Sequence, residues 1–352
     1  MGDTSAYLET GGAGPVVASS PDEALARADE LVSRGRCLDA IDLLRGARAM
    51  DGGPGVDRRL TAVRHQAFRE LPADGEPQPA PPSPAASRVP AGTLAEIEPA
   101  ELTASAVRRA IQGCGGLLVR GLLAGYIQEL VDAIDAAFAA RERARSGENG
   151  GAWYSPLRLG RDEARSLGRH FVAGDNALLA CDSPRFVNDL LDLYERIGLR
   201  RVVADYLQER PVLSANKCTL RHVRLGSGTD WHQDGAFLGR SIRALNVWVA
   251  LTDCGVDAPG LDLVPTRLDD VLPTGTGGAI FDWAVGPDVV DGLKDRAPVV
   301  RPAFRAGDVM LFDELFLHRT AIDASMTRRR YAVEAWFFAP SAYPAAQVPL
   351  VW

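Results

Sequence analysis

Two histidines and one aspartate have the types and the spacing of metal ligands. His232 and Asp234 lie in the segment Asp230-Trp231-His232-Gln233-Asp234-Gly235, and His318 follows much later in the chain. Side chains two residues apart leave the same face of a strand, so one metal ion can contact His232 and Asp234 together. Two imidazoles and one carboxylate bind Fe(II) through three positions and leave the others open for chemistry. These residues therefore predict a mononuclear metal site.

The surroundings of the motif favour a metal site over two simpler interpretations. A His-x-Asp sequence also arises by chance, and a buried histidine bonded to a neighbouring carboxylate produces it as well. Here Gly226, Gly228 and Gly235 flank the first motif, and the segment from Arg305 to Phe312 leads into His318. A turn, a short apolar run, a histidine and an arginine-rich strand start follow one another in an order that suits a catalytic metal site.

An arginine run follows the second histidine. Arg329 stands between Arg328 and Arg330, and its guanidinium can hold a planar carboxylate through two parallel hydrogen bonds. A co-substrate such as 2-oxoglutarate needs that contact. If the segment is already extended, Arg328 and Arg330 point to the opposite face, so the choice of Arg329 depends on where the preceding turn ends.

From about Leu94 to Phe338 the chain resembles the phytanoyl-CoA dioxygenase family of Fe(II)- and 2-oxoglutarate-dependent oxygenases. The resemblance rests on four segments, which are His232-Gln233-Asp234, Asn246 to Asp253, Gly307-Asp308 with Phe312, and His318 to Arg329. It implies a mainly β fold with flanking helices, in which a double-stranded β-helix, or jelly roll, carries the iron at one open end.

The resemblance also implies cofactors and roles. Fe(II) would be held by His232, Asp234 and His318, and 2-oxoglutarate and dioxygen would be co-substrates. Arg329 and Thr320 would bind 2-oxoglutarate, and Gln233 and Trp248 would line its pocket, although Trp248 also suits plain core packing. The reaction would convert 2-oxoglutarate to succinate and carbon dioxide while an unactivated C–H bond of the substrate is oxidised.

Two sequence features bear on the outcome of that reaction. Related oxygenases that transfer chlorine have a small residue at the place of Asp234, so an aspartate argues for hydroxylation or desaturation. After Gly260 the family commonly has a Pro-Gly-Ser-His-like turn, whereas this chain has Val264-Pro265-Thr266-Arg267-Leu268. This departure changes the rim of the site. The expected substrate is a small organic molecule, either a secondary-metabolite intermediate or a lipid-derived acid.

Composition excludes several other classes. The chain has 352 residues, 46% hydrophobic content and a net charge of −7. Nucleic-acid and anionic-membrane binding depend on clustered positive charge, so neither is expected. The five cysteines are scattered without Cys-x-x-Cys spacing, which is typical of reduced thiols. With no long apolar run and no signal-like N-terminus, a cytoplasmic enzyme is expected.

Composition shifts along the chain predict four regions. Residues 1–20 are rich in glycine, alanine and serine and are expected to be disordered. Residues 21–71 have helical periodicity with small residues placed as in a tetratricopeptide repeat, but too few copies for a solenoid. Residues 72–92 are a proline-rich linker, and residues 93–345 form the oxygenase domain.

Within the oxygenase domain, helices are expected first and strands afterwards. Helices are predicted over 98–113, 124–144 and after Ser183-Pro184, and strands over 212–223, 242–251, 260–264, 299–304, 308–312 and 330–338. Residues 146–182 have no sustained period, and a lid over the iron site is predicted there. The alternative to an enzyme is a non-catalytic jelly-roll protein that binds a protein partner through residues 21–71.

Overall fold

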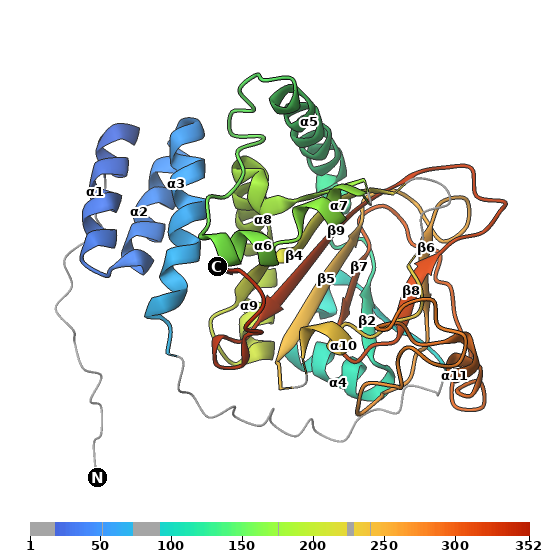
Figure 1. Cartoon of the computed structure of the whole chain (residues 1–352). Helices are drawn as coiled ribbons and strands as arrows, with labels where there is room; N and C mark the ends of the chain where they lie inside the picture. The colour runs from blue at the N-terminus through green and yellow to red at the C-terminus, as the bar shows by residue number, and fades with distance from the viewer. Residues whose placement is uncertain (1–17, 51, 73–91, 175, 224–228, 240) are drawn as a thin grey trace, which may run out of the picture.

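The computed structural model describes residues 18–50, 52–72, 92–174, 176–223, 229–239 and 241–352 (Figure 1). The expectation of disorder over residues 1–20 and of an extended linker over 72–92 falls almost wholly outside these ranges. Within them, no helix is long and apolar enough to cross a membrane. All five cysteines are buried as free thiols.

One large mixed sheet forms the main layer of the fold. In the described ranges its strand order is β1-β2-β7-β5-β9-β4-β10, and β3 pairs with β4. The strands are β1 (Ala95–Ile97), β2 (Gly116–Val119), β3 (Ala177–Leu179), β4 (Val212–Val223), β5 (Ala244–Ala250), β7 (Val309–Phe312), β9 (Arg330–Phe338) and β10 (Pro349–Val351). Only β1 and β2 pair in parallel, and the other pairs are antiparallel.

A smaller layer faces this sheet and carries the second histidine. It consists of β6 (Gly260–Leu263) paired antiparallel with β8 (His318–Ala321), extended by an isolated bridge between His232 and His318. Two facing layers of antiparallel strands make the jelly roll, so the predicted fold class is confirmed. The strand predicted over 299–304 is reduced to isolated bridges at Val300 and Phe304.

Strand alternation decides which side chains face the second layer. In β9, Ala332, Trp336 and Phe338 belong to the core between the two layers, whereas Val333, Ala335 and Phe337 pack against the helices. Glu334 lies opposite Thr219 on β4 and Trp248 on β5. Because residues two apart share a face, Arg330 and Glu334 point into the same interior as Trp336.

Helices cover the outer face of the large sheet (Figure 1). They are α4 (Ala104–Cys114), α5 (Ile127–Arg145), α6 (Arg161–Ser166), α7 (Arg169–Gly174), α8 (Pro184–Arg196) and α9 (Leu199–Leu207), and two short helices, α10 (Gly235–Leu238) and α11 (Pro287–Asp291), lie on the other side. The helix α4 ends at Gly115, whose φ of +89° is left-handed and favours glycine. The chain turns there directly into β2.

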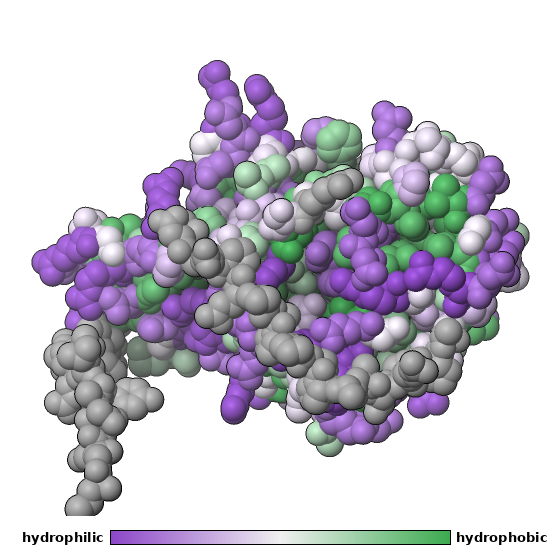
Figure 2. Space-filling view, turned by 90° about the horizontal axis from the view of Figure 1, so that it is seen from below, coloured by the Kyte–Doolittle hydropathy of each residue, from purple (hydrophilic) through white to green (hydrophobic). Residues whose placement is uncertain are grey.

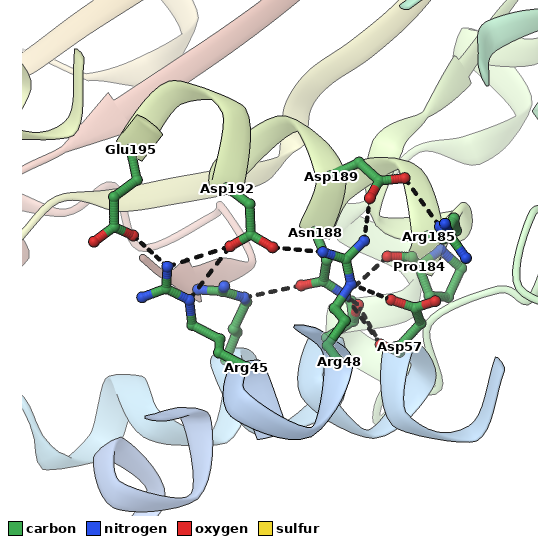
Figure 3. A network of polar contacts seen from close by, with 11 residues as sticks. Arg45, Arg48, Asp57, Pro184, Arg185, Asn188, Asp189, Asp192 and Glu195 are labelled. Carbon is green, nitrogen blue, oxygen red and sulfur yellow. Dashed lines mark hydrogen bonds and ion pairs between the residues drawn. The ribbon is translucent and has the colours of Figure 1, made fainter. Parts of the chain in front are cut away.

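Two of the three N-terminal helices dock onto α8 through a polar network (Figure 3). The three helices are α1 (Pro21–Ser33), α2 (Cys37–Ala49) and α3 (Gly53–Gln66). Arg48 of α2 forms ion pairs with Asp57 of α3 and with Asp189 and Asp192 of α8. The fully buried Arg64 donates to Asn188 Oδ1 at 3.1 Å and to the Val351 carbonyl at 2.8 Å. Both α2 and α3 therefore contact the main domain through arginine side chains, half-buried Arg48 and buried Arg64.

Candidate metal centre and co-substrate pocket

The structure brings His232, Asp234 and His318 together at one end of the jelly roll. Each offers one ligand atom, and these atoms all lie within 4.8 Å of one another. His318 Nε2 is 3.7 Å from Asp234 Oδ2, and the two imidazole centroids are 4.3 Å apart. The bridge between the backbones of His232 and His318 holds the pair in register. Asp234 does not continue a strand, as the sequence analysis assumed, but immediately precedes the short helix α10.

Backbone carbonyls orient both imidazoles. His232 Nδ1 lies 2.8 Å from the Asp230 carbonyl, and His318 Nδ1 lies 3.0 Å from the Phe316 carbonyl. A carbonyl accepts only, so each Nδ1 carries the proton and each Nε2 is left as a lone-pair donor, which is the usual arrangement in metal-binding histidines. Burial, with His318 nearby, lowers the pKa of His232 to about 4. The imidazole is therefore neutral at physiological pH.

The three residues open onto a cavity of about 420 Å³. Its walls combine aromatic rings with a few charged and polar groups, which is the composition of a small-molecule site. The lining residues are Lys217, Arg221, Thr229, His232, Asp234, Phe237, Asn246, Trp248, Leu261, Trp283, Phe312, His318, Thr320, Arg330 and Glu334.

Of the three consecutive arginines from Arg328 to Arg330, Arg330 lines this cavity. Its Nη1 donates to the Pro259 and Gly260 carbonyls at 3.1 and 2.9 Å, and its guanidinium lies over the Trp248 ring at 5.3 Å. Its Nε is buried without a hydrogen-bond partner. Burial lowers the pKa of Arg330 to about 10, so it remains a cation at neutral pH. A buried cation with an unpartnered N–H fits a carboxylate ligand.

Arg329, which the sequence predicts as a 2-oxoglutarate contact, does not line the cavity. Arg329 is exposed and precedes the first residue of β9, whereas Arg330 is buried on the inward parity of that strand. The one-residue difference follows from where the turn before β9 ends. Thr320 does line the cavity, and its Oγ1 accepts a hydrogen bond from Thr229 Oγ1 at 3.1 Å.

Gln233 and Trp248, both expected in the co-substrate pocket, have different positions. Trp248 lines the cavity and also packs on Phe304, with centroids 4.9 Å apart. Gln233 is fully buried away from the cavity, where its Nε2 donates to the Leu315 and Asp270 carbonyls and its Oε1 accepts from Leu272 N at 2.7 Å. Gln233 thus connects the loop after β6 to the His232–Asp234 segment by hydrogen bonds, and it does not line the cavity.

Three charged residues that the sequence analysis did not single out complete the cavity wall on β4 and β9, namely Lys217, Arg221 and Glu334. Lys217 Nζ lies 3.3 Å from Asp234 Oδ1, and Arg221 is paired with Glu334 at 2.9 Å. Burial opposes ionisation of Glu334, but Arg221 and Lys217 lower its pKa to about 2. Lys217 and Arg221 are four residues apart on β4, and both side chains face the cavity.

The insertion at residues 146–182 does not form the predicted lid. No cavity-lining residue comes from its described part; its short helices α6 and α7 precede β3, which pairs with the β4 edge. Within the insertion, the Ser166 carbonyl accepts a hydrogen bond from Asn216 on β4. The loop between β6 and β7 contributes Trp283 to the cavity instead. The lack of periodicity over residues 146–182 indicates a long irregular insertion, but it does not indicate which surface of the domain the insertion covers.

A jelly roll whose open end gathers two imidazoles, a carboxylate and a buried arginine has the build of a non-haem iron oxygenase. The sequence pattern of the family described as phytanoyl-CoA dioxygenase (PhyH) matches residues 115–331. The chain therefore belongs to the phytanoyl-CoA dioxygenase family and is a 2-oxoglutarate-dependent dioxygenase, for which Fe(II), 2-oxoglutarate and dioxygen are the cofactor and co-substrates.

Solved structures show more distant similarity. EctD from S. alaskensis, crystallised with 2-oxoglutarate and 5-hydroxyectoine, is 18% identical over 47% of this chain and 56% of that chain, with a TM-score of 0.37. The 2-oxoglutarate-dependent carbocyclase SnoK from nogalamycin biosynthesis is 16% identical over 69% of this chain and 87% of that one, with a TM-score of 0.42. EvdO2 from Micromonospora carbonacea var. aurantiaca, crystallised with 2-oxoglutarate, is 20% identical over 46% and 66%, with a TM-score of 0.34. No curated protein matches significantly.

Proposed function

We propose that the chain hydroxylates an unactivated C–H bond of a small organic molecule, with His232, Asp234 and His318 as iron ligands and Arg330 as the anchor of 2-oxoglutarate. One observation carries this proposal: three ligand atoms converge within 4.8 Å in the same cavity as a buried arginine with an unpartnered N–H. When bound, Fe(II) supplies dioxygen activation coupled to decarboxylation of 2-oxoglutarate to succinate.

The residues of the chain contribute binding, orientation and exclusion of water. The carbonyls of Asp230 and Phe316 keep the two imidazoles in the metal-binding tautomer. Arg330 would hold the distal carboxylate of 2-oxoglutarate by charge-assisted hydrogen bonds, and the Thr320 hydroxyl, in the same cavity, would assist. Trp248 and Phe312 form apolar walls that keep the co-substrate side of the cavity dry. Related oxygenases that transfer chlorine have a small residue at the place of Asp234, and the halide binds there. Because this chain has an aspartate that would itself be a ligand, hydroxylation is supported over halogenation.

The substrate class expected from the sequence stays a proposal. A secondary-metabolite intermediate or a lipid-derived acid both suit a cavity that combines aromatic walls with cationic groups. The alternative, a non-catalytic protein that works through residues 21–71, loses support because α2 and α3 direct buried arginines toward α8 and not toward solvent.

Oxygen-free titration tests the assignment of ligands. Adding Fe(II) and then 2-oxoglutarate to the full chain is expected to produce the visible absorption of a bound iron–2-oxoglutarate pair, and His232→Ala or Asp234→Ala is expected to abolish it. His170→Ala removes an exposed histidine outside the cavity and serves as the matched control. On admission of dioxygen, the wild type and the control should release succinate. Retained absorption and succinate release in the His232 or Asp234 variant would refute the assignment.

A further inference from the structure

Exposed aromatic side chains gather at the mouth of the cavity. The large apolar residues exposed in the described ranges are Met50, Phe171, Phe237, Val256, Ile280, Phe281, Val299 and Ile322. Phe237 also lines the cavity, and Ile280 and Phe281 stand three and two residues before the cavity-lining Trp283. In Figure 2, the half of the molecule that carries β6, β8 and α11 in Figure 1 has more apolar surface than the half that carries the N-terminal helices. We call Phe237, Phe281 and Trp283 the aromatic rim.

The rings of the aromatic rim are arranged as flat faces. Phe281 and Trp283 are stacked, with centroids 5.1 Å apart and planes 4° from parallel. Phe237 meets Trp283 edge to face at 6.2 Å, and the Trp283 ring stands edge-on to His232 at 5.7 Å. Phe281 of this stacked pair is 49% exposed, and its partner Trp283 is the ring that contacts the candidate iron ligand His232.

Hydrogen bonds to residues of the metal motif hold the rim segment that contains Phe281 and Trp283. Ile280 N donates to Asp230 Oδ2 at 3.3 Å, and Val285 N donates to the Trp231 carbonyl at 2.8 Å. The segment is closed further by a bond from Ala284 N to the Phe281 carbonyl at 3.0 Å. An apolar surface that is already ordered binds a ligand without the entropic cost of ordering the loop. The rim therefore has the properties of a preformed binding surface.

The size of the rim suits a small molecule. A stable protein–protein interface takes about 800 Å² from each partner and about twenty residues, whereas the rim has three rings and Ile280. The cavity of about 420 Å³ must hold iron and 2-oxoglutarate as well as part of the substrate. A substrate with an extended apolar body would leave that body outside the cavity, against the rim.

Positive charge lies between the rim and the iron ligands. Lys217 Nζ is 4.1 Å from the Phe237 centroid, and Arg221 is on the same strand face. Lys217 is paired with Asp234 and Arg221 with Glu334, and Arg330 is the third cation of the cavity, so the cavity as a whole carries one excess positive charge. Fe(II) and the 2-oxoglutarate dianion offset each other, so the excess charge favours a substrate with one acidic group.

We propose that the aromatic rim binds the flat ring system of a monoacidic substrate, whose anionic group faces Lys217 and Arg221 while the edge to be oxidised enters the cavity. This inference rests on the proposed function and narrows its substrate class to ring-containing organic acids. An acyl chain has no flat face and would gain little from stacking on the exposed ring of Phe281.

Binding of pyrenebutyrate to the full chain loaded with Fe(II) and 2-oxoglutarate, without oxygen, tests the proposal. Pyrene emission reports the dissociation constant, which Phe281→Ala is expected to raise about tenfold, a typical loss for one aromatic stacking partner. Phe171→Ala removes a phenylalanine that is 72% exposed and lies outside the cavity lining, and it should leave the constant unchanged. Pyrenebutanol, which lacks the carboxylate, should bind more weakly than pyrenebutyrate.

Each alternative outcome has a defined meaning. Equal constants for the Phe281 and Phe171 variants would overturn the proposal, as would palmitate displacing the probe at lower concentration than pyrenebutyrate itself binds, because the surface would then be one for acyl chains. The iron–2-oxoglutarate absorption is recorded before every titration. If this absorption is missing, the proposed function fails. If the absorption is present and Phe281→Ala leaves the dissociation constant of the probe unchanged, only the rim proposal fails.

Discussion

The ammonium of Lys217 lies 3.3 Å from Oδ1 of Asp234, and His318 Nε2 lies 3.7 Å from the other oxygen, Oδ2. The two carboxylate oxygens therefore have different neighbours. If Oδ2 binds the metal, Lys217 holds the free oxygen and fixes the plane of the carboxylate. Residues that orient a metal ligand in this way commonly change metal affinity by about tenfold to a hundredfold when removed.

Lys217→Met is accordingly expected to weaken Fe(II) binding by about tenfold or more. The chain contains only one other lysine, Lys294, whose exposed ion pair with Asp291 lies outside the cavity. Lys294→Met is thus a matched control with no expected effect. Oxygen-free calorimetric titration of the metal-free protein with Fe(II) measures both. An unchanged dissociation constant in the Lys217 variant would show that Asp234 needs no such support.

A second prediction separates the two neighbouring arginines. Arg330→Ala should weaken 2-oxoglutarate binding by about thirtyfold or more, because truncating one partner of a buried charge pair costs about 2 kcal/mol or more. Arg329→Ala, at an exposed position, should stay within about twofold of the wild type. The dissociation constant is read from the iron–2-oxoglutarate absorption in both variants. The reverse order of effects would restore Arg329 as the anchor.

These two arginines also show how far the sequence alone could lead. Ligand types and spacing were enough to select His232, Asp234 and His318, and residue patterning placed β4 and β9 at the bounds that the structure has. Whether Arg329 or Arg330 faces inward depends on a single residue at the end of a turn, which periodicity does not resolve. Gln233 is bonded to Asp270, Leu272 and Leu315, and contacts so far apart in the chain leave no local pattern.

A third prediction concerns pH and the buried carboxyl of Glu314. Burial, with Asp313 nearby, raises the pKa of Glu314 to about 8 from the model-compound value of 4.5. Between these pH values the unfolded chain releases the proton while the folded chain keeps it, so this group lowers the free energy of unfolding as pH rises from about 4.5 to 8. Glu314→Gln cannot ionise and removes that loss.

Urea denaturation of the metal-free protein at pH 5 and pH 8 checks this expectation. Glu314→Gln should be more stable than the wild type at pH 8, and the difference should shrink at pH 5. Glu129→Gln changes an exposed glutamate in the first turn of α5 and should not alter the pH dependence in this way. A difference between the Glu314 variant and the wild type that is the same at both pH values would contradict the raised pKa.

The last prediction concerns the docking of the N-terminal helices. Arg48 is 13% exposed and pairs with Asp57, which is 3% exposed, and with Asp189 and Asp192 on α8. Removing the guanidinium would leave the Asp57 carboxylate buried without its main partner, which typically costs 3–5 kcal/mol for a fully buried pair. Because Asp189 and Asp192 are about a third exposed, a loss of about 2 kcal/mol is expected for Arg48→Met.

Arg34→Met provides the comparison, since its ion pair with Glu30 is mostly exposed and such pairs contribute about 0–1 kcal/mol. Urea denaturation gives the free energy of unfolding of both variants. If α1–α3 fold with the oxygenase core, Arg48→Met shifts a single cooperative transition, because the side chains of Arg48 and Arg64 connect α2 and α3 to α8 and β10. A separate early transition for the helices would instead indicate an independent module, and would make residues 21–71 available to a partner.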